Sequence, residues 1–207
     1  MKKTLVTLAL FLMGAVAVQA QADQSLPQIG IKGGLNLSTI TSDDFNDGEE
    51  SRTSFNVGLL AELPISDRFS IQPEVLYSAQ GFDIRQNDNG DDVEYQLDYI
   101  QVPVLAKLYL IKGLSVEAGP QFGFKVNEEV DFDPTSDGGD FDIDADDSSV
   151  KDFETSVALG AAYKFDNGFF VSGRYTHGLT NIFDDSSLLG NVDAKNAVWQ
   201  FGVGFMF

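Results

Sequence analysis

Apolar and polar residues alternate over long stretches of this chain, with apolar side chains at every second position. This period is typical of β-strands that have one apolar face. It is clearest over residues 114–127, where the apolar series is Leu114, Val116, Ala118, Pro120, Phe122, Phe124 and Val126. Between such stretches lie clusters of Asp, Asn, Gly and Ser, which are typical of loops. Helical spacing is not sustained after the first twenty residues, so the sequence predicts an all-β fold.

The alternation predicts eight strands, near residues 28–40, 53–63, 68–81, 93–110, 114–127, 152–165, 169–181 and 196–207. The fourth has a regular apolar face only if Tyr95 and Leu97 belong to another register or to a bulge. Three short connections (64–67, 111–113 and 166–168) alternate with four long ones (41–52, 82–92, 128–151 and 182–195). This alternation predicts an eight-stranded antiparallel up-and-down transmembrane β-barrel, with short turns in the periplasm and four long extracellular loops.

The composition of the two series predicts which face meets lipid. The non-apolar series is rich in small residues, which suit a crowded lumen: Gly30, Gly34, Gly58, Gly119, Gly123, Ala158, Gly160, Ala162, Gly202 and Gly204. The apolar series carries aromatic residues at strand ends, as membrane interfaces favour: Phe69, Phe165, Phe169 and Phe207. The sequence therefore predicts an apolar face turned to lipid, and not the inward apolar face of a soluble lipocalin-like barrel.

The non-apolar series also carries charges of both signs near mid-strand. They form a predicted lumen charge network of Lys32, Glu62, Glu74, Lys107, Glu117, Lys125, Glu154, Lys164 and Arg174. Charges that nearly cancel are expected where they must pair away from bulk water. An eight-stranded barrel is wide enough only for its own side chains, so this lumen is predicted to be closed.

Three prolines fit this scheme less well. Pro73, Pro103 and Pro120 lie inside predicted strands, and each removes one donor from a hydrogen-bonded ladder. A closed barrel has no free edge at which to place them, so bulges or strand ends must accommodate them.

The first twenty residues differ from the rest. Lys2 and Lys3 precede an apolar run over residues 5–18, and small residues at 18 and 20 offer a cleavage site. The run is too short to span a bilayer comfortably, so residues 1–20 are predicted to be a secretory signal peptide, with cleavage after Ala22 as an alternative.

Residues 21–207 are predicted to form one outer-membrane β-barrel domain. Without Lys2 and Lys3, this part keeps 11 of the 13 basic residues and all 32 acidic ones, a net charge of −21. So acidic a chain is a poor binder of nucleic acid. The sequence has no cysteine, which excludes both a disulfide framework and a lipid-modified N-terminal cysteine.

Four segments resemble motifs of a known family. They are residues 33–38 (GGLNLS), 72–78 (QPEVLYS), 99–105 (YIQVPVL) and 178–182 (GLTNI). In these motifs and their order, the chain resembles the outer-membrane β-barrel domain family abundant in Bacteroidota, the PorT-like group often labelled "porin family protein". The resemblance implies architecture and a place in a Gram-negative cell envelope more than an activity, and one member group assists type IX secretion. The final Phe207, with Phe205 and Phe201, is similar to the C-terminal signal that barrel-assembly machinery reads.

The single histidine, His177, is the candidate for catalysis. It lies near Ser172, Thr176 and Thr180, but a nucleophilic site needs a hydroxyl and an imidazole within hydrogen-bond reach and a carboxylate to orient them. Ser172 is five residues away, too far along a strand to pair with His177. No catalytic residue is therefore assigned, and a lipid-interface enzyme centred on His177 stays an alternative.

The predicted loop at 128–151 is rich in aspartate. Asp140, Asp142, Asp144 and Asp146 would share one face of an extended segment and are weak candidates for Ca²⁺. The spacing is not that of an EF-hand, and a solvated acidic loop is the simpler interpretation. No cofactor is predicted.

These features predict a monomeric, non-enzymatic barrel of the cell outer membrane. It would act through acidic extracellular loops or as a structural component of the envelope. The expected partners are outer-membrane lipid and lipopolysaccharide, and the barrel-assembly machinery. A narrow channel for small solutes and an accessory role in protein secretion are the further alternatives.

Overall fold

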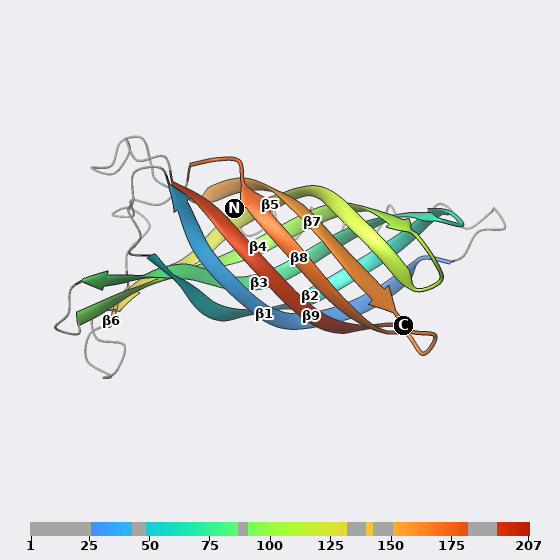
Figure 1. The fold of residues 1–207 in the computed structure, drawn as a ribbon, viewed down its shortest axis with the longest axis horizontal. Coiled ribbons are helices and arrows are strands. Elements are labelled where there is room, and N and C mark those ends of the chain that lie inside the picture. Colours follow the sequence, from blue (N-terminus) through green and yellow to red (C-terminus); the bar gives the residue numbers. More distant parts are fainter. Residues whose placement is uncertain (1–25, 43–48, 87–90, 132–139, 143–150, 182–193) are drawn as a thin grey trace, which may run out of the picture.

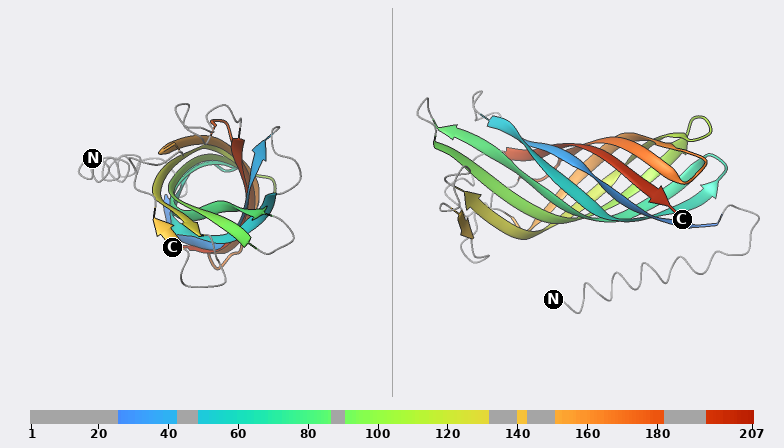
Figure 2. Two further views of the ribbon diagram at one scale, coloured as in Figure 1. Left: turned by 90° about the vertical axis from the view of Figure 1, so that its left-hand side faces the viewer. Right: turned by 90° about the horizontal axis from the view of Figure 1, so that it is seen from below.

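The computed structural model describes residues 26–42, 49–86, 91–131, 140–142, 151–181 and 194–207, which form a closed antiparallel barrel (Figures 1 and 2). The signal peptide predicted over residues 1–20 lies outside the described residues. The strands are β1 (Gln28–Ser42), β2 (Glu49–Ser66), β3 (Phe69–Gln86), β4 (Asp91–Tyr109), β5 (Leu114–Asp131), β6 (Asp140–Asp142), β7 (Phe153–Lys164), β8 (Phe169–Gly178) and β9 (Ala194–Met206). Among the described residues, no helix is long and apolar enough to cross a membrane.

Eight of these nine strands form the wall. Each pairs with its neighbours in chain order, β5 pairs with β7, and β1 pairs with β9 to close the ring. The short β6 pairs with the far end of β5, at Glu129–Asp131, outside the closed wall. The predicted fold class, an eight-stranded antiparallel up-and-down barrel, is confirmed.

Several strands run further than the alternation predicted. β2 begins at Glu49, β3 continues to Gln86 and β4 begins at Asp91, so the predicted loop bounds of 41–52 and 82–92 were wrong. β5 and β6 likewise extend into the predicted loop at 128–151, whereas β8 ends at Gly178, before the predicted residue 181. A strand needs only about 9–11 residues to cross a bilayer. The 18 or 19 residues of β2 to β5 are therefore expected to project beyond it. Figure 1 shows the strand ends that extend past the rest of the barrel on the side of β6.

The irregularity expected in the fourth strand lies in the fifth. Asp98 pairs with Asn127 and Tyr99 with Lys125, which leaves Val126 of β5 as the extra residue of a bulge. β4 itself alternates regularly, and Leu97 and Tyr99 simply face the interior, where both are buried.

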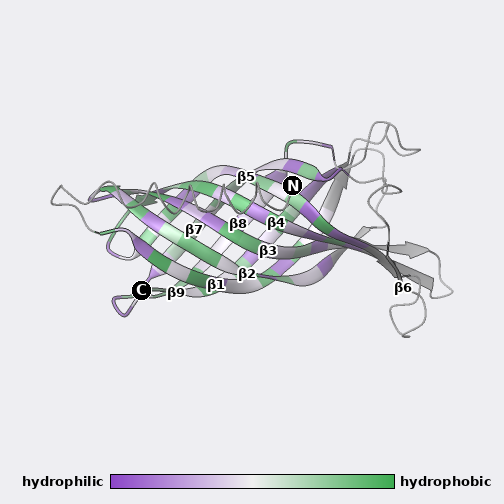
Figure 3. Cartoon of the chain, turned by 180° about the vertical axis from the view of Figure 1, so that it is seen from behind, coloured by the Kyte–Doolittle hydropathy of each residue, from purple (hydrophilic) through white to green (hydrophobic). Residues whose placement is uncertain are grey.

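The wall is apolar outside and polar inside, the reverse of a soluble protein. Leu59, Leu159 and Phe201 are 53 %, 65 % and 51 % exposed on the outer face, whereas the interior Glu74 and Arg174 are each 1 % exposed. Hydrophobic and hydrophilic residues alternate along the strands in Figure 3. At the short-turn end, the ring of Phe165 lies 4.9 Å from that of Tyr163 and 5.8 Å from that of Phe169. Such rings suit the membrane interface, and the outward apolar face matches the prediction.

The prolines occupy gaps in three successive ladders. Between β2 and β3, the pairs skip from Leu60–Glu74 to Leu63–Ile71, next to Pro73. The β3–β4 ladder skips two positions at Pro103, and the β4–β5 ladder skips two at Pro120. Each proline thus has a gap in the ladder on one side and a ladder pair on the other. The three gaps lie on successive strands, and together they form a seam of prolines across the wall.

Candidate functional site

The interior is closed by a group of charges centred on Arg174 of β8. This Arg174 group consists of Arg174, Glu74, Glu117 and Lys32. Its Nη1 and Nη2 atoms donate to the two carboxylate oxygens of Glu74 at 2.9 and 2.6 Å. Its Nε and Nη2 atoms donate to Oε1 of Glu117 at 3.0 and 2.8 Å. Lys32 adds a second cation, with its Nζ 3.8 Å from Glu74. A guanidinium that binds one carboxylate through two nitrogens and a second carboxylate beside it forms a rigid cross-brace between β3, β5 and β8.

Polar contacts continue from this group towards the short-turn end. Gln72 donates to Glu74 at 2.7 Å and accepts from Lys107 at 2.9 Å. Lys107 reaches Glu62 at 3.5 Å, and Lys164 reaches the same carboxylate at 3.3 Å. Tyr109 and Ser70 also donate to Glu62, at 2.6 and 3.0 Å. Below Glu62, an open vestibule of about 530 Å³ lies among the short turns.

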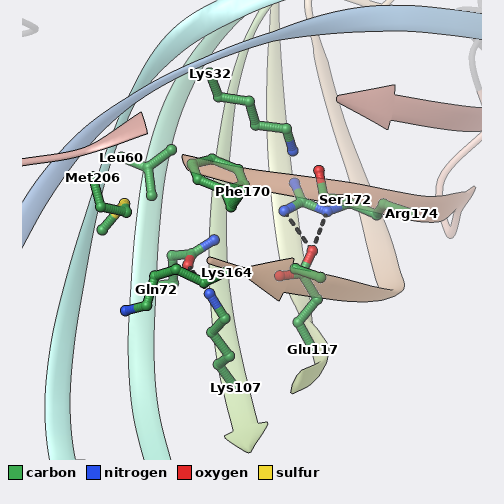
Figure 4. Close-up of a pocket in the computed structure, with 11 residues that line it drawn as sticks. Lys32, Leu60, Gln72, Lys107, Glu117, Lys164, Phe170, Ser172, Arg174 and Met206 are labelled. Carbon is green, nitrogen blue, oxygen red and sulfur yellow. Dashed lines mark hydrogen bonds and ion pairs between the residues drawn. The ribbon is translucent and has the colours of Figure 1, made fainter. Parts of the chain in front are cut away.

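A small apolar cluster lies beside these charges. Leu60, Phe170 and Met206 are buried against one another inside the barrel. Gly204 makes room for this cluster, because a Cβ there would meet the ring of Phe170 and the carbonyl of Ile31. A cavity of about 10 Å³ remains beside them, bordered by Arg174 and Glu117, and is drawn in Figure 4. It has room for about one water molecule, so the side chains that border it leave no path for solutes.

Amide and hydroxyl groups fill the half of the interior nearer the long loops. Asn36 donates to Ser78 and Asn56 donates to Asn36, at 3.0 and 2.6 Å. Asn196 donates to Gln80 at 2.6 Å. Several buried polar atoms in the described interior have no hydrogen-bond partner, among them Oε1 of Gln101, Oε1 of Gln121 and both amide atoms of Gln200.

The structure places all nine residues of the predicted charge network on the interior face, but it divides them. Seven lie in the two connected groups described above: Lys32, Glu62, Glu74, Lys107, Glu117, Lys164 and Arg174. Lys125 instead pairs with Glu128 at 2.6 Å and with Asp152 at 3.6 Å. Glu154 accepts from the amides of Gln101 and Asn196. Glu128 was missed because the bulge at Val126 turns it inward, out of the period-two series.

His177 and Ser172 point to opposite sides of β8. Ser172 borders the interior cavity, whereas His177 lies on the outer face, its ring 6.3 Å from that of Tyr175. Thr180 accepts a hydrogen bond from the Thr155 amide at 3.0 Å. The structure therefore brings no hydroxyl nucleophile to His177 within the described residues.

Two of the four calcium candidates, Asp144 and Asp146, lie outside the described residues. Asp140 and Asp142 are in β6, where the backbone register sets them opposite Asp131 and Glu129 of β5. Within the described residues, no three His, Cys, Asp or Glu side chains gather as a metal site would need.

The predicted assembly signal lies at the short-turn end of β9. The backbone amide of Phe207 donates to the Ile29 carbonyl at 2.8 Å, and its ring meets that of Phe205 at 5.3 Å. The side chain of Phe207 is 71 % exposed, on the outer apolar face.

Solved structures of similar shape are bacterial surface barrels. Neisserial surface protein A aligns with a TM-score of 0.56 at 13 % identity, over 86 % of this chain and 97 % of that one. Ail, the attachment invasion locus protein of Yersinia pestis, in complex with the heparin analogue sucrose octasulfate, aligns with a TM-score of 0.50 at 13 % identity, over 87 % and 99 %. At such identities the likeness shows the fold alone. Comparison with curated protein sequences finds no match.

A closed eight-stranded wall with an apolar exterior and a charged interior defines a small outer-membrane β-barrel protein. Residues 19–184 match the model of the outer membrane protein beta-barrel domain, and the chain belongs to that family. Its place is therefore the cell outer membrane, in which barrels of this kind turn their long loops outwards.

Proposed function

We propose that this protein is a closed, non-enzymatic barrel that acts at the cell surface through its acidic strand extension. The extension consists of the long-loop ends of β2 to β5 together with β6. The observation that carries the proposal is a row of acidic positions across all five strands. The backbone register sets Glu50 opposite Asp83, Asp83 opposite Glu94, Glu94 opposite Asp131, and Asp131 opposite Asp140.

Such a row favours a basic partner. Like charges opposite one another across strands are destabilising, so a cationic ligand gains energy by relieving their repulsion. Charge complementarity of this kind sets partner choice and speeds association. The row thus suits a basic polypeptide. Ail was solved with a sulfated heparin analogue, a polyanion, and the acidic row together with a net charge of −19 opposes a ligand of that sign here.

The interior supports a surface role over transport. The charges around Arg174 and the apolar cluster of Leu60, Phe170 and Met206 leave a cavity of about 10 Å³ between them. A channel would need continuous open space, and in the described part of the interior the polar side chains are packed against one another. A catalytic role finds no support either, because Ser172 and His177 lie on opposite faces of β8.

The remaining parts of the proposal concern biogenesis and relatives. Residues 1–20 act as a signal peptide, and the exposed Phe207 is read by the barrel-assembly machinery. The mature chain is a monomer whose outer face contacts lipid and lipopolysaccharide. The motifs over 33–38, 72–78, 99–105 and 178–182 support a place in the PorT-like group of Bacteroidota, where an accessory role in secretion is one form of surface interaction.

Binding measurements on the barrel in lipid nanodiscs test the proposal. The probes are a lysine-rich peptide and a sulfated polysaccharide, at several salt concentrations. The wild type should bind the peptide in a salt-dependent way and not the polysaccharide. The double variant Glu94→Gln/Asp131→Asn should bind the peptide more weakly.

A matched control, Asp67→Asn/Asp166→Asn, removes two carboxylates at the short-turn end. It should leave peptide binding unchanged. Equal losses in the two double variants would show that net charge alone attracts the peptide, and no binding by the wild type would exclude the basic partner.

A further inference from the structure

Glu154 differs from every other interior carboxylate of the described chain. Glu62, Glu74, Glu117 and Glu128 each have a Lys or Arg nitrogen within 3.5 Å. Glu154 is 5 % exposed, and its contacts in the part of the chain that the structure describes are two amides, at 2.9 Å from Gln101 and 3.4 Å from Asn196. A buried carboxylate without a cation is costly, because two neutral hydrogen bonds do not replace the water it has lost.

Two neighbours of Glu154 in the ladders carry buried amide oxygens without partners. The ladder sets Gln101 opposite Gly123 and Gly123 opposite Glu154, so the two side chains meet across β5. Gln121 lies two residues along β5 from Gly123, on the same interior face. The Oε1 atoms of Gln101 and Gln121 are buried, and neither has a hydrogen-bond partner. Carboxylate and amide oxygens are the ligands that hard cations prefer.

Gly123 creates the space in which these groups gather. A Cβ at this position would stand 2.6 Å from Cγ of Glu154 and 3.1 Å from Nε2 of Gln101. Any other residue would therefore displace the carboxylate or the amide. Because Gly123 has no side chain, the side chains of Glu154 and Gln101 can both project into the interior.

We propose that Glu154, with the amide oxygens of Gln101 and Gln121, binds an alkali metal cation, Na⁺ or K⁺, that enters from the long-loop end. A single carboxylate balances a single positive charge, whereas calcium sites usually gather several. The cation goes no further, because Arg174 and Lys32, paired with Glu74 and Glu117, fill the interior beyond it. A cation at this site therefore cannot cross the barrel, and the site does not conduct. It is independent of what the strand extension binds.

Sodium NMR on the refolded barrel in micelles tests this site. Wild-type protein should broaden the ²³Na resonance, and potassium should reverse the broadening while choline at equal ionic strength should not. The variant Glu154→Gln should weaken the sodium effect by about tenfold or more, as losses at metal sites commonly do. Glu128→Gln is the matched control, since that carboxylate already has Lys125 as its partner, and it should keep the effect.

A second variant distinguishes loss of the site from misfolding of Glu154→Gln. Gln101→Leu keeps the carboxylate and removes one proposed oxygen ligand, so it should also weaken the sodium effect. Equal broadening by wild type and Glu154→Gln would overturn the proposal. So would an infrared band of a protonated carboxyl at neutral pH that Glu154→Gln removes, because a proton would then occupy the place of the cation.

Discussion

At the scale of single residues, the interior depends on partners that are far apart in sequence. Arg174 and Glu74 are 100 positions apart, yet they share two hydrogen bonds. The sequence could predict that both lie on the interior series, because strand alternation decides which face a residue occupies. It could not predict that they pair, because partners across a barrel follow from strand tilt and register, which the alternation does not fix. For the same reason it could not show that Glu154 lacks a cationic partner.

Removing the Arg174 side chain should strongly destabilise the barrel. Arg174→Met keeps much of the volume but leaves Glu74 and Glu117 buried, with the more distant Lys32 as the nearest cation. Loss of one partner from a buried ion pair commonly costs about 3–5 kcal/mol. Urea unfolding of the refolded barrel in micelles, followed by tryptophan fluorescence, measures this loss.

Lys112→Met serves as the control for that variant. Lys112 pairs with Asp166 at 2.7 Å in the short turns, and the hydrogen bond to Asp166 raises the pKa of Lys112. Both side chains of the pair are more than 80 % exposed, so its loss should scarcely change unfolding. Similar midpoints for the two variants would contradict the role given to the Arg174 group.

At the scale of strands, the sequence predicted the membrane-crossing parts and missed the strand ends. Within the membrane one face must be apolar, which imposes the alternation seen in residues 114–127. Beyond the membrane both faces can be polar, so residues such as Glu50 and Asp92 continue a strand without any apolar signal. The bulge at Val126 was missed for a related reason, since it shifts the period by one within a polar stretch.

The seam of prolines should be the part of the wall that opens most readily. The ladders of β2 to β5 each skip two positions beside Pro73, Pro103 or Pro120, whereas the β1–β9 ladder runs without a gap from Gly30–Met206 to Ser42–Ala194. Segments with fewer hydrogen bonds open at lower free energy. Amide exchange followed by NMR in micelles should therefore be faster at residues 74–75 and 104–105 than along β9. Uniform protection around the barrel would show that the gaps do not weaken the wall.

At the scale of the whole molecule, two kinds of side chain fill the lumen. Arg174 lies four residues after Phe170 on β8, about 13 Å along the strand, and both side chains border the same cavity of about 10 Å³. The ion-paired side chains resist ions because their charges are fixed, and the apolar cluster of Leu60, Phe170 and Met206 resists wetting. We expect either group alone to prevent conduction.

Planar-bilayer conductance should show this redundancy as a non-additive effect. Wild-type barrel should give no open-channel current, and neither should Phe170→Ala or Arg174→Ser, because each leaves the other group of side chains in place. The double variant Phe170→Ala/Arg174→Ser removes a ring from the apolar cluster and the central cation from the ion-paired group, so it should conduct. Its lumen would then keep an excess of carboxylates at Glu74 and Glu117, and the current should be cation-selective. Large currents from the wild type would show that the interior side chains move apart. Currents from either single variant would show that the remaining group does not close the lumen alone.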